Sequence, residues 1–539
     1  MDGLDDSIRT IPAAVRAAAE TYGNRLAVAE PGGQALTFRD LLGQVRTVAR
    51  AMIAGGIEPG DRVAFWSPNT RHWVAGALGA LYAGATLVPV NTRFTGPEAL
   101  DVTHRSRARA LFVADPFLGA DRYALLAAAA AEAGAGLPGL VIAIAVEPGA
   151  RVADSRPALG WERFLDRAAE VPERVADERA AAVGPGDVSD ILFTSGTTGR
   201  SKGAMSAHGQ ALGVARAWAA CAGLTSADRY LIVNPFFHSF GYKAGILACL
   251  LTGAAIFPQQ TFDVAAAMRL IESERITVFP GAPTVYASIL DHPERPDRDL
   301  SSLRLAVTGA AVVPAALVER MRAELSFDTV LTAYGLTEAV VVTMCRPGDD
   351  PRTVAATSGR ATAGFEITIA PAGQRARGPT SAATETGEIL LRGPNVMLGY
   401  LDDDAATAEA IDADGWLHTG DVGHLDERGY LTITDRLKDM YICGGFNVYP
   451  AEVEQVLARH PGVAESVVIG IPDGRLGEVG KAFVVPRPSA PWASAAELIE
   501  FCRASLANYK IPRHVEFRAE LPRNPAGKPL KRLLRQESR

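Results

Sequence analysis

Residues 194–203 read TSGTTGRSKG and directly follow the short apolar run ILF at 191–193. The run predicts a strand that ends in a loop, and the loop glycines let the backbone turn tightly and direct its N–H groups toward an anion. Hydroxyl side chains add donors and Lys202 adds a positive charge, so the loop suits a polyphosphate. A Walker A loop needs Gly before the lysine and Ser or Thr after it. Here Ser201 precedes Lys202 and Gly203 follows it, so that pattern fails; a flexible surface loop is the remaining alternative.

Four further motifs follow this loop in a fixed order along the chain: YGLTE at 334–338, GD at 420–421, DRLKD at 435–439 and PAGK at 525–528. Together with the loop they resemble the core motifs of the adenylate-forming superfamily, which comprises acyl-CoA synthetases, adenylation domains and beetle luciferases. The resemblance covers nearly the whole chain. It implies an α/β fold with a large N-terminal adenylate-forming domain, made of two α/β/α subdomains and a small β-barrel-like unit, and a small mobile α+β C-terminal domain.

The domain boundary is placed at the DRLKD motif. This gives an AMP-binding adenylation domain at 1–436 and the C-terminal domain of AMP-binding enzymes at 437–539. The length of 539 residues exceeds that of one ordinary core and agrees with two or more domains.

Composition narrows the function classes. The chain is 48% hydrophobic and 21% charged, which predicts a globular protein, and its net charge of −7 comes with no block rich in Lys or Arg. Nothing therefore favours a nucleic-acid partner or an anionic membrane surface. The acidic start MDGLDDSIRT has no apolar core, so we expect no standard secretory signal. The five cysteines are scattered without a CxxC pair, which predicts a cytoplasmic protein with no zinc site.

Two uncharged runs, 73–90 and 244–262, are nominally long enough to suggest membrane spans. Each divides instead into a helix, a turn at Gly84 or Gly253, and a strand. A buried helix that leads into a parallel strand is apolar on all sides. We therefore reject stable membrane insertion and expect repeated α/β units.

The order of these units predicts two related α/β/α subdomains, at about 40–180 and 180–320, in which a helix at 265–274 is followed by a strand at 277–280. From about 355 to 435, short strands and glycines predict a small antiparallel or barrel-like unit. In the C-terminal domain we expect a helix at 451–460, strands at 466–470 and 481–485, and a helix opened by a capping box at 494–497. Residues 524–528 are expected to form an exposed loop with a lysine at its tip.

The chemistry that the resemblance implies is the activation of a carboxylate by ATP. The carboxylate oxygen attacks the α-phosphorus and pyrophosphate leaves, so the site needs cations and fixed donors more than a base. Glu338 supplies a carboxylate for Mg²⁺, a hard cation that prefers oxygen, and Thr194 is a second predicted magnesium ligand. Thr337 is suited to the α-phosphate. The predicted nucleotide-binding residues are Thr194, Ser195, Gly196, Thr197, Thr198, Gly199, Lys202, Gly309, Ala310, Ala311, Ala333, Tyr334, Gly335, Leu336, Thr337, Glu338, Asp421, Arg436 and Lys528.

Individual roles also come from the resemblance. Tyr334 is expected near the adenine, Asp421 on the ribose hydroxyls, and Arg436 on the ribose or a phosphate. Lys438 matches the hinge position at which the small domain turns. Lys528 is the expected catalytic cation at the α-phosphate and the carboxylate, and the predicted catalytic set is Lys528, Thr194, Lys202, Glu338 and His238.

The resemblance also implies a second half-reaction, in which the acyl group is transferred from the adenylate to the thiol of CoA, and this step requires a path for CoA. We expect the pantetheine arm to pass Cys443, Gly444 and Gly445, because glycines allow close approach to the backbone. Cys443 is interpreted as a small wall residue and not as a nucleophile. His238, within the aromatic segment PFFHSF at 235–240, is expected beside the acid. The predicted acyl pocket comprises Phe236, His238, Tyr242, Lys243, Val285, Tyr286 and Ala339.

These observations predict an ATP- and Mg²⁺-dependent acyl-CoA ligase that acts through an acyl-adenylate, with a small carboxylic acid, ATP and CoA as its partners. Residues 187–194, 234–238, 242–249 and 437–445 resemble actinobacterial ligases for the indanedione propanoate (HIP) that remains after steroid-ring degradation. A medium-chain or aryl acid CoA ligase is the alternative within this mechanism. Two alternatives have a different function. One is a non-CoA adenylate-forming enzyme, such as an adenylation module or a luciferase-like oxygenase, and the other is a nucleotide-binding pseudo-enzyme.

Overall fold

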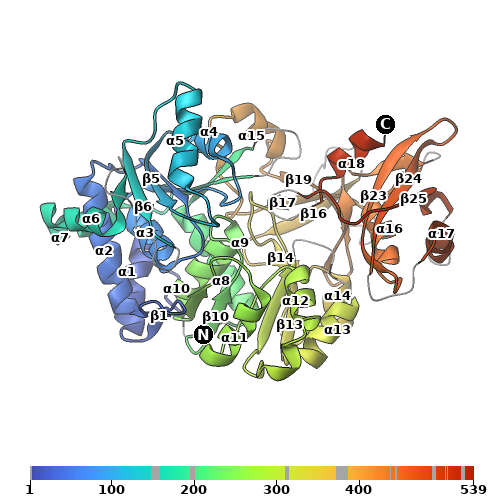
Figure 1. The fold of residues 1–539 in the computed structure, drawn as a ribbon, viewed down its shortest axis with the longest axis horizontal. Helices are drawn as coiled ribbons and strands as arrows, with labels where there is room; N and C mark the ends of the chain where they lie inside the picture. Colours follow the sequence, from blue (N-terminus) through green and yellow to red (C-terminus); the bar gives the residue numbers. More distant parts are fainter. Residues whose placement is uncertain are drawn as a thin grey trace.

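The computed structural model describes residues 3–146, 158–194, 201–309, 313, 315–371, 386–437, 439–443, 446–487, 493–503, 506, 508–523 and 529–538. Helix-covered sheets form the left and the lower centre of the molecule in Figure 1, and a small sheet leads from them to the C-terminal unit at the right. The predicted mixed α/β fold with a second, smaller C-terminal unit is confirmed.

The first large sheet has eight strands in the order β18-β9-β8-β4-β3-β5-β6-β7. It is parallel from β8 to β7, whereas β9 and β18 run antiparallel to their neighbours. The strands are β3 Arg62–Trp66, β4 Thr86–Pro89, β5 Ala108–Ala114, β6 Leu140–Ile144, β7 Leu159–Gly160, β8 Val188–Phe193, β9 Gly203–Ala207 and β18 Gly399–Tyr400. The helices of this unit are α2 Phe38–Ala54, α3 Arg71–Tyr82, α4 Gly96–Arg105, α5 Arg122–Glu132, α6 Trp161–Asp166, η1 Arg167–Glu170 and α7 Glu173–Ala182.

Both faces of this sheet are buried. On β3, Val63 and Phe65 belong to one apolar cluster, whereas Ala64 and Trp66 belong to another. Successive side chains of a strand point to opposite faces, so a strand covered on both sides must be apolar throughout. Strands β4 and β11 (Ala255–Pro258), which lie within the uncharged runs at 73–90 and 244–262, are likewise buried at every residue, and this accounts for the strand part of those runs.

The second large sheet consists of two four-stranded halves, β2-β1-β11-β10 and β12-β13-β14-β15, which Val278 joins through single bridges to β10 and β12. Its strands are β1 Leu26–Val28, β2 Leu36–Thr37, β10 Arg229–Ile232, β11 Ala255–Pro258, β12 Leu305–Gly309, β13 Thr329–Tyr334, β14 Thr343–Met344 and β15 Arg360–Ala361. The associated helices are α1 Ile11–Tyr22, α8 His208–Ala222, α9 Ser239–Gly241, η2 Tyr242–Leu247, α10 Ala248–Thr252, α11 Val264–Glu274, α12 Pro283–Leu290, η3 Arg295–Asp297, α13 Ala315–Glu324 and α14 Pro351–Ala356.

The two predicted helix–glycine–strand units are confirmed as α3 with β4 and α10 with β11. Gly84 and Gly253 have φ values of +84° and +76°, in the left-handed region that glycine adopts without strain. Within the part of the chain that the structure describes, no helix is both long and apolar enough to span a membrane.

The predicted subdomain ranges are wrong at their edges. Strands β8, β9 and β18 complete the first sheet although they follow residue 180, and β1 and β2 join the second sheet although they precede residue 40. The segment predicted as a strand at 277–280 forms bridges through Val278 alone. Strand partners are chosen by packing between segments distant in sequence, which local patterns do not reveal.

The small unit predicted between about 355 and 435 is a four-stranded antiparallel sheet in the order β16-β17-β19-β20. Its elements are β16 Glu366–Pro371, β17 Gly387–Arg392, α15 Asp404–Ala410, β19 Leu417–Leu425 and β20 Leu431–Arg436.

The C-terminal unit is a sheet in the order β22-β21-β24-β23, with β25 paired to β24. The predicted strands at 466–470 and 481–485 lie within β23 and β24, and the Ser494 amide donates to the Glu497 carboxylate over 2.7 Å, as the predicted capping box requires. The elements are β21 Tyr441–Cys443, β22 Phe446–Val448, α16 Pro450–Leu457, β23 Val463–Asp473, β24 Gly477–Pro486, α17 Ala495–Arg503, η4 Asn508–Lys510, β25 His514–Phe517 and α18 Lys531–Glu537.

A buried histidine predicts acid sensitivity of the N-terminal domain. His208 begins α8, is 2% exposed, and its Nδ1 accepts a hydrogen bond from the Ile11 amide over 3.3 Å. Burial lowers the pKa of His208 to about 4, so the unfolded chain takes up a proton near the ordinary pKa while the folded chain does not. The resulting stability is complete above pH 6.5 and is lost as pH falls toward 4.

We expect the free energy of unfolding to fall by about 2 kcal/mol through His208 between pH 7 and pH 5. Urea unfolding at each pH measures this loss. His208→Asn, which keeps an acceptor for the Ile11 amide, should reduce the pH dependence, and the same change at the exposed His514 should not. Equal pH profiles for the wild type and His208→Asn would contradict the prediction.

Candidate active site

The base of the predicted phosphate loop is held closed. The Thr194 amide donates to the Lys202 carbonyl over 2.8 Å, which continues the antiparallel pairing of β8 and β9. Arg105 of α4 donates to the Ser201 carbonyl over 2.6 Å, and its guanidinium lies 5.2 Å from the centre of the Phe193 ring. Both ends of the loop are therefore fixed to one arginine. Residues 195–200 lie outside the described residues.

Lys202 and Glu338, which belong to two different predicted motifs, meet at a third residue that the sequence analysis missed. The Tyr400 hydroxyl donates to Glu338 Oε1 over 2.7 Å, and Lys202 Nζ lies 4.9 Å from the centre of the Tyr400 ring. Burial, followed by the neighbouring Glu338 charge, raises the pKa of Tyr400 well above its usual range. The hydroxyl therefore stays protonated and acts as a donor. The sequence signal was a lone Gly-Tyr pair at 399–400, too short to stand out.

The YGLTE motif forms a tight turn after β13. The Leu336 carbonyl accepts from the Val340 amide and the Tyr334 carbonyl accepts from the Val342 amide over 2.9 Å. A Cβ at Gly335 would lie 1.5 Å from the Val340 carbonyl oxygen, so a side chain there would open the turn. Val340 has a φ of +61°, which is rare for a β-branched residue. This packed turn places Thr337 and Glu338 at the end of the strand.

Tyr334 and Asp421 are neighbours. The Tyr334 hydroxyl donates to Asp421 Oδ2 over 2.6 Å, and both side chains are buried. Glu388 of β17 holds the part of β19 that precedes Asp421, because it accepts from the Gly420 amide over 3.1 Å and lies 3.0 Å from His418 Nδ1. Arg436 is opposite Asp421 in the pairing of β19 and β20. The structure therefore brings three predicted nucleotide-binding positions together, and their roles remain predictions.

Gly309 and Ala333 also lie side by side, at the paired ends of β12 and β13. A Cβ at Gly309 would lie 2.3 Å from the Ala333 carbonyl oxygen, which explains the glycine at this strand end. Ala310 and Ala311, predicted beside them, lie outside the described residues, as do Lys438, the predicted hinge residue, and Lys528, the predicted catalytic cation.

Most residues predicted for the acyl pocket lie in the apolar core. Phe236 and Tyr242 pack near Trp73, with ring centres 5.2 Å and 5.9 Å from the indole. The Tyr286 hydroxyl donates to the Phe279 carbonyl over 2.7 Å; Ala339 is fully buried and Val285 is half-buried. Their contact with an acid remains a prediction.

Lys243 is buried and forms an ion pair with Asp190. Its Nζ lies 2.8 Å from Asp190 Oδ1 and donates to Ser206 Oγ over 2.8 Å, with the lysine and aspartate side chains 1% and 0% exposed. The pair connects η2 to the β8–β9 hairpin, whose connecting loop is the predicted phosphate loop. Asp190 was not predicted from the sequence; its signal was an aspartate directly before the apolar residues ILF at 191–193.

His238 is exposed, and its place beside an acid remains a prediction. Its Nδ1 accepts from the Phe240 amide over 3.2 Å, which in the neutral ring places the proton on Nε2. The preceding segment is held by the connection between β3 and α3, because Asn69 there accepts from the Phe236 amide over 2.7 Å and donates to the Asn234 carbonyl over 2.9 Å.

Cys443 ends β21 and is buried, and burial raises the pKa of its thiol. A neutral buried thiol is a poor nucleophile, which agrees with its interpretation as a wall residue. Gly444 and Gly445, the other residues predicted at the CoA path, lie outside the described residues.

The donors available for Mg²⁺ are few but suitable. Among the described residues, no group of three or more His, Cys, Asp or Glu side chains is arranged to hold a metal ion. Magnesium is normally held by one or two carboxylates together with substrate phosphates and water. The single Glu338 carboxylate, oriented by Tyr400 and with Lys202 on the face of the same ring, fits an ion that arrives with a nucleotide.

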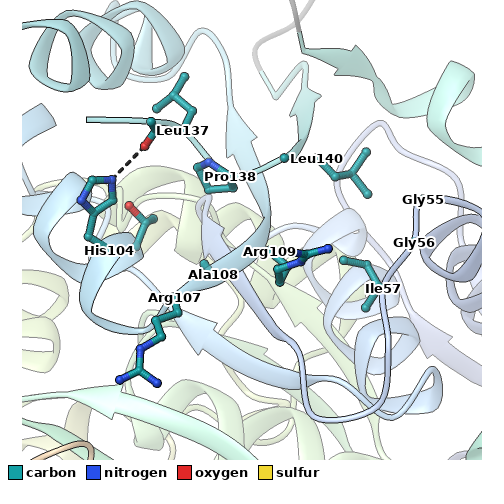
Figure 2. Close-up of a pocket in the computed structure, with 13 residues that line it drawn as sticks. Gly55, Gly56, Ile57, His104, Arg107, Ala108, Arg109, Leu137, Pro138 and Leu140 are labelled. Atoms are coloured by element: carbon teal, nitrogen blue, oxygen red, sulfur yellow. Dashed lines mark hydrogen bonds between the residues drawn. The ribbon is translucent and has the colours of Figure 1, made fainter. Parts of the chain in front are cut away.

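A separate surface cavity of about 540 Å³ lies between the end of α2, the α4–β5 junction and the start of β6 (Figure 2). Within it, His104 Nε2 lies 2.8 Å from the Gly136 carbonyl oxygen, and the Arg109 side chain lies along one wall. It is lined by none of the predicted site residues.

Comparison with known proteins gives the family. The model of the AMP-binding enzyme family matches residues 15–401, and that of the AMP-binding enzyme C-terminal domain matches residues 452–528. The chain belongs to the AMP-binding enzyme family. The predicted resemblance to adenylate-forming enzymes is thereby confirmed.

Two relatives of this AMP-binding enzyme are similar over almost their whole length. One, from Rhodococcus jostii strain RHA1, is named 3-[(3aS,4S,7aS)-7a-methyl-1,5-dioxo-octahydro-1H-inden-4-yl]propanoyl:CoA ligase and is 58% identical over 530 residues, covering 98% of this chain and 99% of the relative. A protein of the same name from Mycobacterium tuberculosis strain H37Rv is 56% identical over 535 residues, with coverage of 98% and 99%. The solved structure of an anthranilate CoA ligase in complex with anthranoyl-AMP has a TM-score of 0.86 at 28% identity, covering 99% of each chain.

Proposed function

We propose that this AMP-binding enzyme is an ATP-dependent acid:CoA ligase that acts on the indanedione propanoate named in its relatives. The observation that carries the proposal is the identity of 58% and 56%, over 98% of the chain, to two ligases named for that acid. The charged residues that the chemistry needs are all in the sequence, namely Lys202, Glu338, Asp421, Arg436 and Lys528. Their presence argues against a pseudo-enzyme.

In the first half-reaction, a carboxylate oxygen of the acid attacks the α-phosphorus of ATP. The P–O bond to pyrophosphate breaks, and an acyl-adenylate forms. The phosphate loop with Lys202 holds the β- and γ-phosphates, Asp421 receives the ribose hydroxyls, and Lys528 offsets charge between the two approaching anions. Glu338 and Thr194 are the residues that would hold Mg²⁺, which supplies further charge compensation on the phosphates when bound.

In the second half-reaction, the sulfur of CoA attacks the acyl carbon, the thiol proton leaves, and AMP departs with the former carboxylate oxygen. We assign the path of the pantetheine arm to Cys443, Gly444 and Gly445. A domain boundary at residues 436 and 437, with Lys438 as the hinge, would let the C-terminal domain present Lys528 in the first step and this segment in the second. We further propose a cytoplasmic location, where ATP and CoA are available.

The test is AMP release by the purified protein with ATP, Mg²⁺ and CoA across four acids: the indanedione propanoate, octanoate, benzoate and a longer steroid side-chain acid. Strong selectivity for the indanedione propanoate would support the proposal. Turnover of octanoate or benzoate instead would retain the ligase mechanism and reject the substrate. AMP release that needs the acid but no CoA would point to the non-CoA alternative.

A further inference from the structure

Tyr400 is fixed in place by its backbone. It lies on β18, which pairs with β9 directly after the phosphate loop; the Leu401 amide donates to the Gly203 carbonyl over 2.8 Å. The Tyr400 amide donates to Thr407 Oγ1 over 2.9 Å. A Cβ on the preceding Gly399 would lie 2.9 Å from Thr407, and the φ of Gly399 is +146°. The backbone conformation here thus depends on glycine, and it sets the direction of the tyrosine ring.

The side chain of Tyr400 joins two groups of opposite charge. Its hydroxyl donates to Glu338 Oε1 over 2.7 Å, and its ring face lies 4.9 Å from Lys202 Nζ, while the residue is 8% exposed. A donor on one carboxylate oxygen fixes the orientation of the carboxylate and leaves lone pairs on the other oxygen. An aromatic face attracts an ammonium group without neutralising it. Both charged groups therefore stay available to a ligand while their positions are held.

We propose that Tyr400 is a positioning residue for the metal–nucleotide complex, orienting Glu338 through its hydroxyl and Lys202 through its ring. This inference rests on the proposed function, because it takes Glu338 as the magnesium ligand and Lys202 as the phosphate ligand. Groups that hydrogen-bond to a metal-binding carboxylate typically change metal affinity by about 10- to 100-fold when they are removed. Tyr400 acts through the two ligands and not on the reacting atoms.

The chain contains a matched control for this arrangement. The Tyr430 hydroxyl donates to Asp349 over 2.6 Å, and the guanidinium groups of Arg428 and Arg360 lie 4.6 Å and 5.0 Å from its ring centre. Like Tyr400, it is buried, at 6% exposure. None of these control residues belongs to the predicted site, so Tyr430→Phe removes an equivalent hydrogen bond without touching a predicted ligand.

The experiment measures binding of a non-hydrolysable ATP analogue by calorimetry over a range of Mg²⁺ concentrations, and binding of AMP without the metal. Tyr400→Phe should raise the Mg²⁺ concentration needed for half-maximal analogue binding by about 10- to 100-fold. AMP affinity should remain that of the wild type. Tyr430→Phe should change neither value. In the background of Glu338→Gln, Tyr400→Phe should have little further effect, since the hydroxyl acts through that carboxylate.

Equal Mg²⁺ dependence in the wild type, Tyr400→Phe and Tyr430→Phe would overturn the inference. A loss of AMP affinity equal to the loss of analogue affinity would overturn it as well, because a general disturbance of the site explains that result. The readout does not depend on turnover. If the Mg²⁺ shift is seen but no acid supports AMP release, Tyr400 keeps its role and the proposed ligase function fails.

Discussion

Replacing Lys528 with alanine is expected to slow acyl-adenylate formation by about 100- to 1,000-fold, the usual effect of removing one group that stabilises charge in a transition state. The physical reason is that the carboxylate and the α-phosphate are both anionic, and Lys528 is the cation that the motif order assigns between them. Pyrophosphate release in a single turnover measures this step. Thioester formation from chemically prepared acyl-AMP and CoA should stay close to the wild-type rate. In that step no free carboxylate has to approach the α-phosphate, so the charge that Lys528 offsets is not created.

Two further variants make this result specific. Lys531→Ala removes a lysine three positions away that pairs with Glu454 over 2.9 Å, and it should leave both half-reactions unchanged. Gly445→Trp should give the reverse of Lys528→Ala, with normal pyrophosphate release and little thioester, because the indole would fill the predicted path of the pantetheine arm. Equal losses in both half-reactions for Lys528→Ala would contradict the role given to Lys528.

Lys243→Met is expected to lower the free energy of unfolding of the N-terminal domain by about 3–5 kcal/mol. The substitution leaves the Asp190 carboxylate, which is fully buried and 2.8 Å from Lys243 Nζ, without its counter-charge. An unpaired charge in a low-dielectric interior is far less stable than the same charge in water. Equilibrium urea unfolding followed by tryptophan fluorescence measures the loss.

The double variant Asp190→Leu/Lys243→Met should be more stable than Lys243→Met alone, because it leaves no charge unpaired. Arg174→Met is the surface control: its partner Glu178 is 3.3 Å away and both side chains are mostly exposed, so we expect a loss below about 1 kcal/mol. A loss of that small size for Lys243→Met would show that water reaches the pair and would contradict the prediction.

Local patterns determined much of this protein from its sequence. The loop at 194–203 and the four motifs after it identified the family, and the family models confirm it. The capping box at Ser494 and the turns at Gly84 and Gly253 were also predicted, because each depends on residues within a few positions of one another. The strands predicted at 466–470 and 481–485 lie within β23 and β24 for the same reason, whereas β21, β22, β25 and α18 were not predicted.

The tertiary structure alone decided which distant residues meet. Tyr400 joins Lys202 to Glu338, and Asp190 pairs with Lys243, across separations that no local pattern spans. The membership of the two large sheets, including β18 at the edge beside the phosphate loop, was likewise beyond the sequence pattern. Strand pairing and buried charge pairs depend on packing between segments far apart in the chain. The motifs therefore gave a predicted set of site residues, and only the fold determined which neighbours those residues have.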